Sequence, residues 1–283
     1  MKKWLVSFVS ILLLLSLAAC GQTADPVDSK TKKKDSITLS EVFAKTNEAS
    51  KKLESVHSDM ELNQIVNVPG QETPMELHST ISADMVLNPM ALHQKMKMNV
   101  KGGEEAIQNQ TMDIEAYLAK EGFFMYEPTS KQWMQMPEEF SNQILQMPEQ
   151  QANPVEQLKQ LQQFAKDFSF KQNDTQYILN LKASGEKFDQ FLKENAKKLM
   201  PDALKEDMEA LDNLKFKNVN FEIFIDKKTF NITSLNTNQE VEVISDGEKM
   251  NMKQEIKSTY TNYNKLKEIK VPKEVLDTAQ ELQ

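Results

Sequence analysis

The chain has 283 residues, a formal net charge of −8 and a single cysteine, and all of its 34 basic residues are lysine. Arginine dominates the bidentate recognition of phosphate and guanine, so its absence from an acidic chain argues against nucleic-acid binding. A single cysteine cannot form an intrachain disulfide, so the hydrophobic core alone must hold the fold.

Residues 1–19 have the pattern of an export signal. Two lysines precede an apolar run over residues 4–15, which is shorter than the roughly 20 residues needed to span a bilayer. The sequence Leu-Ala-Ala-Cys at residues 17–20 resembles a lipobox, and it predicts cleavage between Ala19 and Cys20 with lipid (palmitate) attachment at Cys20. Two or three acyl chains would anchor the protein to the extracytoplasmic face of the cell membrane. The alternative is an ordinary cleaved signal in which Cys20 is incidental.

The next segment, residues 20–37, is predicted to be the lipidated cysteine and a flexible tether. Residues 21–36 are polar and have no apolar period. The lysines within residues 30–34 would either touch anionic headgroups or simply be solvated. Cleavage would leave 264 residues with a net charge of about −10, because the signal contains two lysines and no acid. Residues 38–283 are predicted to form a single domain.

That domain is predicted to open with a helix over residues 39–54. Thr38 and Glu41 have capping-box spacing, and Ile37 with Val42 could form a hydrophobic staple. Residues 55–136 then alternate between apolar and polar positions, as β-strands do. Turns are expected at residues 69–70, 88–89 and 101–103. Residues 111–126 and the run around Trp133 are predicted to form a hairpin closed by residues 127–130.

Residues 137–214 are predicted to be a helical insertion. One short helix begins at Pro137 and stops before Pro148, and another begins at Pro154 with Phe168 on its apolar face. A strand-like piece over residues 177–182 interrupts the helices. Two further helices are marked by Phe188, Phe191, Leu192 and Leu199 and by Leu204, Met208 and Leu211.

The last third has the clearest strand pattern. Strands are predicted over residues 218–225, 230–236, 241–243 and 250–263, with Asp246-Gly247 as a tight turn. A short closing helix follows Pro272, with Val275, Leu276 and Ala279 facing inward. This order predicts an α+β fold, in which a curved antiparallel sheet forms a half-open β-barrel and helices pack on its concave face.

Several segments carry a resemblance to a known group of proteins. They are the lipobox with its tether, the helix leading into a strand at Val56, and the runs at residues 115–117, 124–133, 224–232 and 263–272. Together they resemble the LolA/LppX-like superfamily, and within it uncharacterised lipoproteins of Gram-positive bacteria. The resemblance implies an apolar concave side, which carries lipids or lipoproteins in some members, while others act as sensors or partner proteins.

Sixteen methionines are the most unusual feature of the composition. Several form i,i+2 pairs, which point to the same side of a strand. Such side chains could form an ordinary core, a Cu(I) site or an adaptable hydrophobic groove, because methionine is flexible and polarisable. No histidine or second cysteine accompanies them to complete a metal site. The candidate groove residues are Met85, Met96, Met98, Met112, Met125, Met134 and Met136.

Nothing in the sequence predicts catalysis, a cofactor or a metal ion. His57, His78 and His93 lack metal-ligand spacing, and no nucleophile elbow or phosphate-binding glycine loop is present. Tyr126 and Trp133 could stack on a sugar or a peptide, or pack across strands. We therefore predict a non-enzymatic, lipid-anchored carrier or sensor for a lipid or acyl chain. The alternative is an envelope interaction protein that docks a protein partner and has a solid core.

Overall fold

The computed structural model describes residues 22–28, 30–32, 34–71, 73–102, 110–145, 154–183, 185–199, 213–245 and 248–282. The predicted export signal with Ala19 and Cys20, the turn at Asp246-Gly247 and the helix predicted around Leu204 lie outside these residues.

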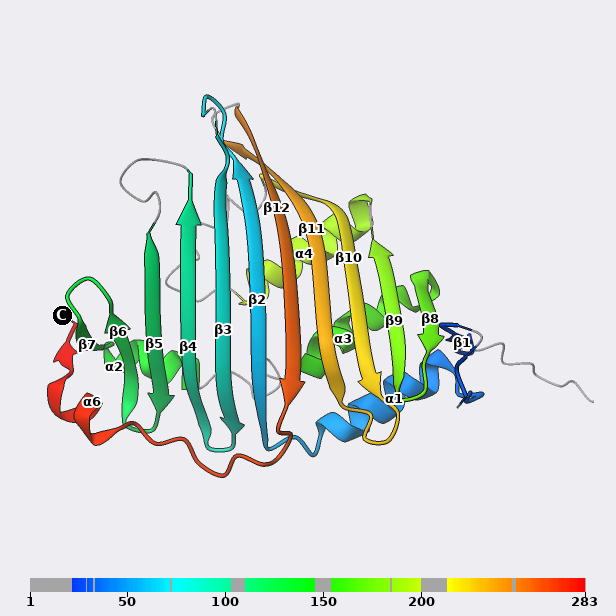
Figure 1. The fold of residues 1–283 in the computed structure, drawn as a ribbon, viewed down its shortest axis with the longest axis horizontal. Helices are drawn as coiled ribbons and strands as arrows, with labels where there is room; N and C mark the ends of the chain where they lie inside the picture. Colours follow the sequence, from blue (N-terminus) through cyan, green and yellow to red (C-terminus); the bar gives the residue numbers. More distant parts are fainter. Residues whose placement is uncertain are drawn as a thin grey trace, which may run out of the picture.

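One large, open, curved sheet of thirteen strands dominates the described part of the chain (Figure 1). Its order is β1-β8-β9-β10-β11-β12-β2-β3-β4-β5-β6-β7-β13, with β1 and β13 at opposite edges. Only these two short edge strands pair in parallel, and all other neighbours are antiparallel, as predicted. The strands are β1 (Asp25–Pro26), β2 (Ser55–Asn67), β3 (Met75–Leu87), β4 (Met90–Lys101), β5 (Thr111–Ala119), β6 (Gly122–Glu127), β7 (Gln132–Gln135), β8 (Phe168–Gln172), β9 (Gln176–Ala183), β10 (Leu214–Asp226), β11 (Ile232–Ser245), β12 (Glu248–Thr261) and β13 (Gln280–Glu281).

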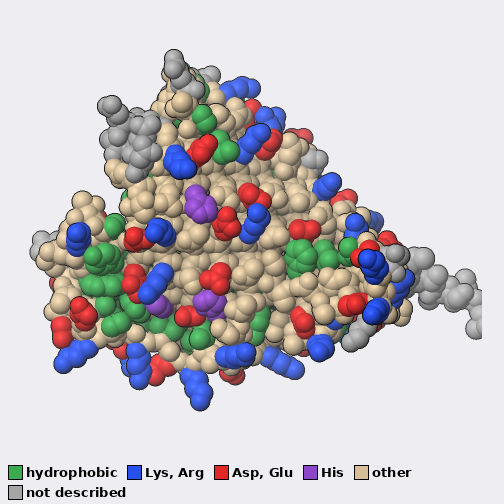
Figure 2. All heavy atoms as spheres, viewed as in Figure 1, with side chains coloured by type: hydrophobic (Ala, Val, Ile, Leu, Met, Phe, Trp, Pro, Cys, Tyr) green, Lys and Arg blue, Asp and Glu red, His purple; other side chains and the backbone are tan. Residues whose placement is uncertain are grey.

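The helices are few and lie mainly on one side of the sheet. Viewed as in Figure 1, α1 (Leu39–Ser50), α3 (Pro154–Leu161) and α4 (Glu186–Leu199) lie behind the part from β12 to β8, and α2 (Glu138–Leu145) lies behind β5 and β6. A 3-10 helix (Gln162–Asp167) continues α3, and α6 (Lys273–Thr278) lies near the C-terminal edge. We call the side that α1 to α4 cover the apolar face, and the opposite side, shown in Figure 2, the polar face.

Helix α1 begins as its sequence predicts. The Thr38 side chain accepts a hydrogen bond from the Glu41 backbone N–H, and the Glu41 carboxylate accepts one from the Thr38 backbone N–H. This capping box satisfies N–H groups that the first turn of a helix leaves without partners. The predicted apolar stripe is buried at Leu39, Val42, Phe43 and Thr46, although the helix ends at Ser50 rather than at residue 54.

The main core lies between these helices and the apolar face of β8 to β11. Phe43 of α1 meets Phe168 of β8 edge-on at 5.8 Å, and Phe188 of α4 meets Phe221 of β10 at 6.2 Å. A second, smaller core lies on the polar face at the opposite end of the sheet. There the C-terminal segment covers the sheet, and the buried residues include Tyr117, Phe124, Val271 and Val275.

The N-terminal segment, residues 22–38, differs from the predicted tether in its described residues, because it is bound to the sheet edge. Thr23 forms a bridge with Thr38, and the Leu39 backbone N–H donates to the carbonyl of Gln22 at 2.8 Å. Strand β1 pairs with the end of β8, and the Val27 N–H donates to the Gln172 carbonyl at 2.9 Å. Sequence pattern could not show this, because the segment contributes backbone groups and almost no apolar side chains.

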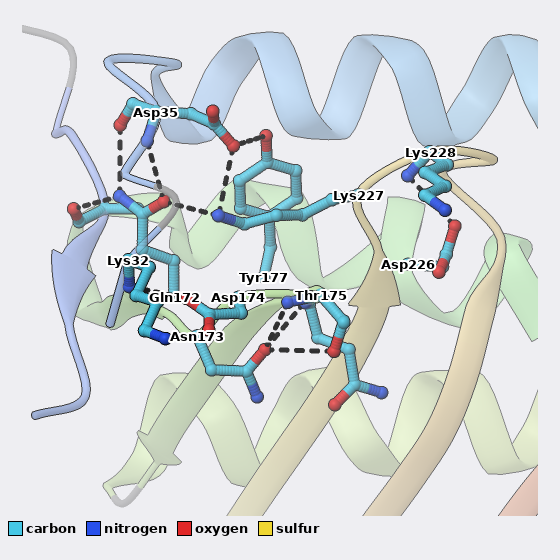
Figure 3. Close-up of polar contacts among 12 residues, drawn as sticks. Lys32, Asp35, Gln172, Asn173, Asp174, Thr175, Tyr177, Asp226, Lys227 and Lys228 are labelled. Carbon is cyan, nitrogen blue, oxygen red and sulfur yellow. Dashed lines mark hydrogen bonds and ion pairs between the residues drawn. The ribbon is translucent and has the colours of Figure 1, made fainter. Parts of the chain in front are cut away.

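Gln172 is the residue that holds this segment (Figure 3). Its side chain is 1% exposed and points from β8 into the loop. The Nε2 group donates to the carbonyls of Ala24 and Asp35 at 2.8 and 3.0 Å, and Oε1 accepts from the Asp35 N–H at 2.9 Å and the Lys227 ammonium at 2.7 Å. A buried polar side chain is stable only when hydrogen-bonded, and Gln172 meets that condition through the N-terminal segment.

The middle block, residues 137–214, departs from the predicted helical insertion. Helices α2, α3 and α4 form where expected, but β8 and β9 both join the main sheet. Phe168 is therefore the first residue of a strand, not a helix position. The spacing of Leu161, Ala165 and Phe168 fits a helix, whereas the alternation of Phe168, Phe170 and Gln172 fits a strand, and tertiary packing decides between the two.

Three smaller predictions also change. The segment 111–126 is two strands rather than one, because the chain turns at residues 120–121, just before Gly122, where φ is +128°. The predicted strands 230–236 and 241–243 are parts of one long strand, β11. In α6 Val275 is buried as predicted, but Leu276 is 42% exposed.

Candidate functional site

All seven candidate groove methionines lie on the apolar face. Met96 and Met98 are two residues apart in β4, and Met98 pairs directly with Met112 of β5. Met125 pairs with Met134 of β7, and direct partners share a face of a sheet. The same alternation places Met85 on this side. Met136 directly follows β7, and its backbone N–H donates to the Phe123 carbonyl at 2.8 Å, which continues the ladder and places Met136 on this side too. Met60 of β2 joins them through its partner Ile81. We call the apolar face of β2 to β7 the methionine face.

The methionine face is less deeply buried than the core. Each of the seven methionines is half-buried, and none of them belongs to either buried cluster. In Figure 1, α2 lies behind β5 and β6 and α4 lies behind β10, and no helix of the described residues lies behind β3. The predicted residues therefore come together on one side of the sheet, between the helices at its two ends.

A large hollow in the described part lies on the other side, on the polar face. This trough has a volume of about 790 Å³, and sequence reasoning did not predict it. Its side chains form two rows that run across strands, one from Thr259 to Tyr126 and one from Lys257 to Asp113. Met60, Ile81, Met96 and Ile114 lie between the rows, so their backbone forms the floor while their side chains point to the methionine face.

Charges of both signs line the trough and pair across strands. The Lys95 ammonium lies 3.6 Å from the Glu115 carboxylate, which also accepts from the Tyr117 hydroxyl at 3.0 Å. The His93 ring nitrogen Nε2 lies 2.8 Å from the same carboxylate. Burial raises the pKa of Glu115, but the hydrogen bonds from His93 and Tyr117 outweigh it and hold the pKa below its usual value. Burial, aided by Glu115, raises the pKa of Tyr117 to about 12.

An aromatic cluster closes one end of the trough. His93 stacks on Tyr117 at 4.3 Å, and Trp133 contacts both Tyr117 and Tyr126, with ring centroids 5.7 and 5.5 Å apart. Trp133 packs against the second core, whereas Tyr126 lines the trough. Of the two aromatic residues singled out from the sequence, only Tyr126 therefore presents its ring to this hollow.

The three histidines all lie on the polar face, away from the methionines (Figure 2). His57 lies 2.7 Å from Asp84 and 3.1 Å from Asp59. The pKa of His57 is raised above its usual value, mainly by the hydrogen bond with Asp84. His78 lies 2.7 Å from Asn63. Within the described ranges, no three His, Cys, Asp or Glu side chains are placed to hold a metal ion. Within those same ranges, no helix has the length and apolar character to cross a bilayer.

Comparison with solved structures finds distant likenesses. A lipovitellin structure, described as showing lipid–protein interactions, aligns with 76% of this chain at 8% identity and a TM-score of 0.34. This chain spans only 26% of that protein. An S-type phycobiliprotein lyase from Guillardia theta covers 82% of this chain and 95% of its own, at 7% identity and a TM-score of 0.20. A β-barrel-like protein of the DUF1849 family from Brucella abortus covers 74% and 99%, at 8% identity and a TM-score of 0.21.

No curated protein sequence matches the chain. The model of a family of unknown function, DUF6612, matches residues 38–280. The match begins at Thr38, the N-cap of α1, and ends at Gln280, the first residue of β13. The chain therefore belongs to the DUF6612 family.

Proposed function

We propose that this protein is a lipid-anchored, extracytoplasmic binding protein whose methionine face takes an apolar ligand such as a lipid or an acyl chain. The proposal has two parts, which rest on different residues. The anchor rests on the lipobox ending at Cys20. The binding activity rests on the seven methionines that the strand register places together on one side of the sheet.

The half-burial of that face is the observation that carries the binding proposal. Methionine has three rotatable bonds and a polarisable sulfur, so a surface rich in it adapts to apolar partners of different shapes. A solid core would instead be expected to bury its side chains fully, as the same face does at Phe170 and Leu179. We further propose that the sheet curves as a half-open barrel around this side, as in the LolA/LppX-like superfamily, with the helices on the concave surface.

Native mass spectrometry of residues 21–283, purified gently from a bacterial host, tests the binding proposal. We expect an extra mass that organic solvent releases and that is identified as a lipid. Binding of a dansyl-labelled fatty acid then gives an affinity for the purified protein. A clean apo protein that also fails to bind the probe would contradict the proposal.

Two neighbouring residues of β4 provide a matched pair of variants. Met98→Glu places a charge on the methionine face, and we expect at least about tenfold weaker probe binding, equivalent to roughly 1.4 kcal/mol. Lys97 is the neighbour of Met98, but its side chain lies on the polar face. Lys97→Glu should therefore leave probe binding unchanged. Equal effects of the two variants would show that the probe does not bind at the methionine face.

The trough supports a second candidate function, the docking of a protein partner on the polar face. Its exposed lysines and acids alternate across strands, and Tyr126 supplies an aromatic contact at one end. Mixed charges of this kind favour specificity and encounter rate in protein association. A photo-crosslinking residue at Thr80 tests this candidate in intact membranes. A partner adduct that Lys95→Glu abolishes would support it, and an adduct that persists in that variant would count against it.

A further inference from the structure

In its described residues, the N-terminal segment 22–38 is a loop closed at both ends rather than a free strand of chain. The bridge between Thr23 and Thr38 and the bond from the Leu39 N–H to the Gln22 carbonyl join its two ends. Gln22 is also tied to the sheet itself, because its Nε2 group donates to the Phe168 carbonyl at 2.9 Å. The first described residue is therefore already bound to the domain.

The contacts inside the loop are partly buried and charge-assisted. The Lys227 ammonium, whose side chain is 8% exposed, lies 3.0 Å from the Asp35 carboxylate and 5.2 Å from the centre of the Tyr177 ring. The Tyr177 hydroxyl donates to the same carboxylate at 3.0 Å (Figure 3). On the outer side of the loop, the Lys32 N–H donates to the Asp174 carboxylate at 2.6 Å. Hydrogen bonds to charged groups are stronger than neutral ones, so these contacts favour a fixed loop.

We infer that the lipid anchor holds the β1–β8 edge of the sheet directly against the phospholipid headgroups, with no flexible spacer between membrane and domain. The inference rests on the proposed lipidation of Cys20. Only Gly21 lies between Cys20 and Gln22, and two extended residue steps reach about 7 Å. That reach is similar to the headgroup layer of one leaflet, roughly 5–7 Å. A free tether of residues 20–37 would instead have a mean span of about 20–25 Å.

If the β1–β8 edge lies at the membrane, the other strands lie at increasing distances from it along the sheet. Strand β1 lies at one edge of the sheet and β13 at the other. At about 4.8 Å between strands, twelve steps give a contour of roughly 55–60 Å. The methionine face and the trough lie in strands between these edges. The short connection between Cys20 and Gln22 sets this attachment, so the attachment should not depend on salt. The charges of the segment also oppose one another, because it carries Asp25 and Asp28 as well as its lysines.

The test uses the full-length lipoprotein, reconstituted in vesicles of phosphatidylcholine and phosphatidylglycerol that contain a headgroup-attached quencher. Lipidation occupies the only natural cysteine, so a single introduced cysteine can carry a fluorophore. Ser169→Cys places it on β8 and Gln132→Cys places it on β7, and both positions are exposed on strands. We expect at least about twofold stronger quenching at Ser169 than at Gln132, because nearly the whole width of the sheet separates them.

A third variant tests whether the short connection between Cys20 and Gln22 causes this difference. A flexible insertion of about 20 Gly and Ser residues after Gly21 restores a spacer with a mean span of roughly 25 Å without changing the fold, and the quenching difference should fall. Equal quenching at both positions in the lipidated protein, or a difference unaffected by the insertion, would overturn the inference alone. Mass spectrometry of the N-terminal peptide from the same sample reports the anchor separately. An unmodified Cys20 would overturn the anchor and this inference together.

Discussion

The apolar face of the sheet has two halves that differ in composition and in covering. One row of directly paired residues crosses both, running Leu181, Phe221, Thr237, Ile256, Leu62, Ser79, Met98 and Met112. Where α1, α3 and α4 lie against the sheet, the strands present Phe, Tyr, Leu and Ile, and these residues are buried. Farther along, in β2 to β7, methionine becomes frequent and its side chains are half-buried.

The difference teaches that one alternating pattern supports two kinds of surface. Leucine, isoleucine and phenylalanine have few rotamers and pack into a unique arrangement, as a core beneath helices requires. Methionine specifies packing poorly and adjusts to its neighbours. We interpret the covered half as the part that stabilises the fold, and the methionine face as the part kept adaptable for binding.

The largest expected effect is on the covered half. Phe170 is 1% exposed in β8, and Phe170→Ala should lower the free energy of unfolding by about 3–5 kcal/mol through lost burial and a cavity. Met98→Ala on the methionine face should cost less than about 2 kcal/mol, because a half-buried side chain loses less contact. Urea denaturation of both variants measures the difference. Equal costs would show that the two halves are one continuous core.

The next effect concerns the N-terminal segment. Gln172→Ala removes the side chain that joins Ala24, Asp35 and Lys227, so the Ala24 and Asp35 carbonyls lose a buried donor and Lys227 loses an acceptor. We expect a loss of about 2–3 kcal/mol, with the segment released first. Limited trypsin digestion should then cut after Lys30 and Lys32 in the variant sooner than in the wild type. Ser169→Ala, an exposed position in the same strand, is the control and should digest like the wild type.

Much of the fold could be predicted from the sequence because the signals are local. The capping box at Thr38, the alternation in β10 and the buried Val275 follow from spacing over a few residues. Strand β8 was missed because five residues fit a helix and a strand almost equally well. The bound N-terminal segment was missed because its contacts join Asp35 to Gln172 and Lys227, far apart in the chain.

The candidate sites show the same division. The i,i+2 pairs place Met96 with Met98 from sequence alone, but only the strand register shows that Met112 and Met125 lie on the same side. Apart from Tyr126, the trough had no sequence signal, because its polar lining is a set of isolated Lys, Asp, Glu, Ser and Thr residues from β12, β2, β3, β4 and β5. Such a site is assembled by strand order, which alternation does not specify.

A conservative change should separate adaptability from stability on the methionine face. The triple variant Met96→Leu, Met98→Leu and Met112→Leu preserves apolar volume, so its free energy of unfolding should change by less than about 1.5 kcal/mol. If methionine flexibility serves binding, the variant should discriminate more strongly among dansyl-labelled fatty acids of different chain length than the wild type does. The same three substitutions leave the trough side chains in place and should not affect crosslinking at Thr80. An unchanged chain-length profile would count against an adaptable surface.

The smallest expected effect is a pH dependence on the polar face, opposite the methionines. The hydrogen bond with Asp84 chiefly raises the pKa of His57 above its ordinary value near 6.5, so the folded protein binds this proton more tightly than the unfolded chain. The resulting stabilisation is fully present below about pH 6.5 and is lost as the pH rises through the raised pKa. His57→Gln should therefore lower the urea midpoint more at about pH 5.5 than at about pH 9.

The partner of His57 supplies the control for this pH dependence. Asp84→Asn keeps the shape of the side chain and a hydrogen-bond acceptor but removes the charge that favours the imidazolium. In this variant the NMR titration of the His57 ring should move back toward pH 6.5, and the pH-dependent part of the His57→Gln effect should shrink. Because His57 and Asp84 face away from the methionines, neither substitution should alter fatty-acid binding. A loss of probe binding in Asp84→Asn would instead show that the two faces of the sheet are energetically coupled, and the separation between a polar docking face and an apolar binding face would have to be abandoned.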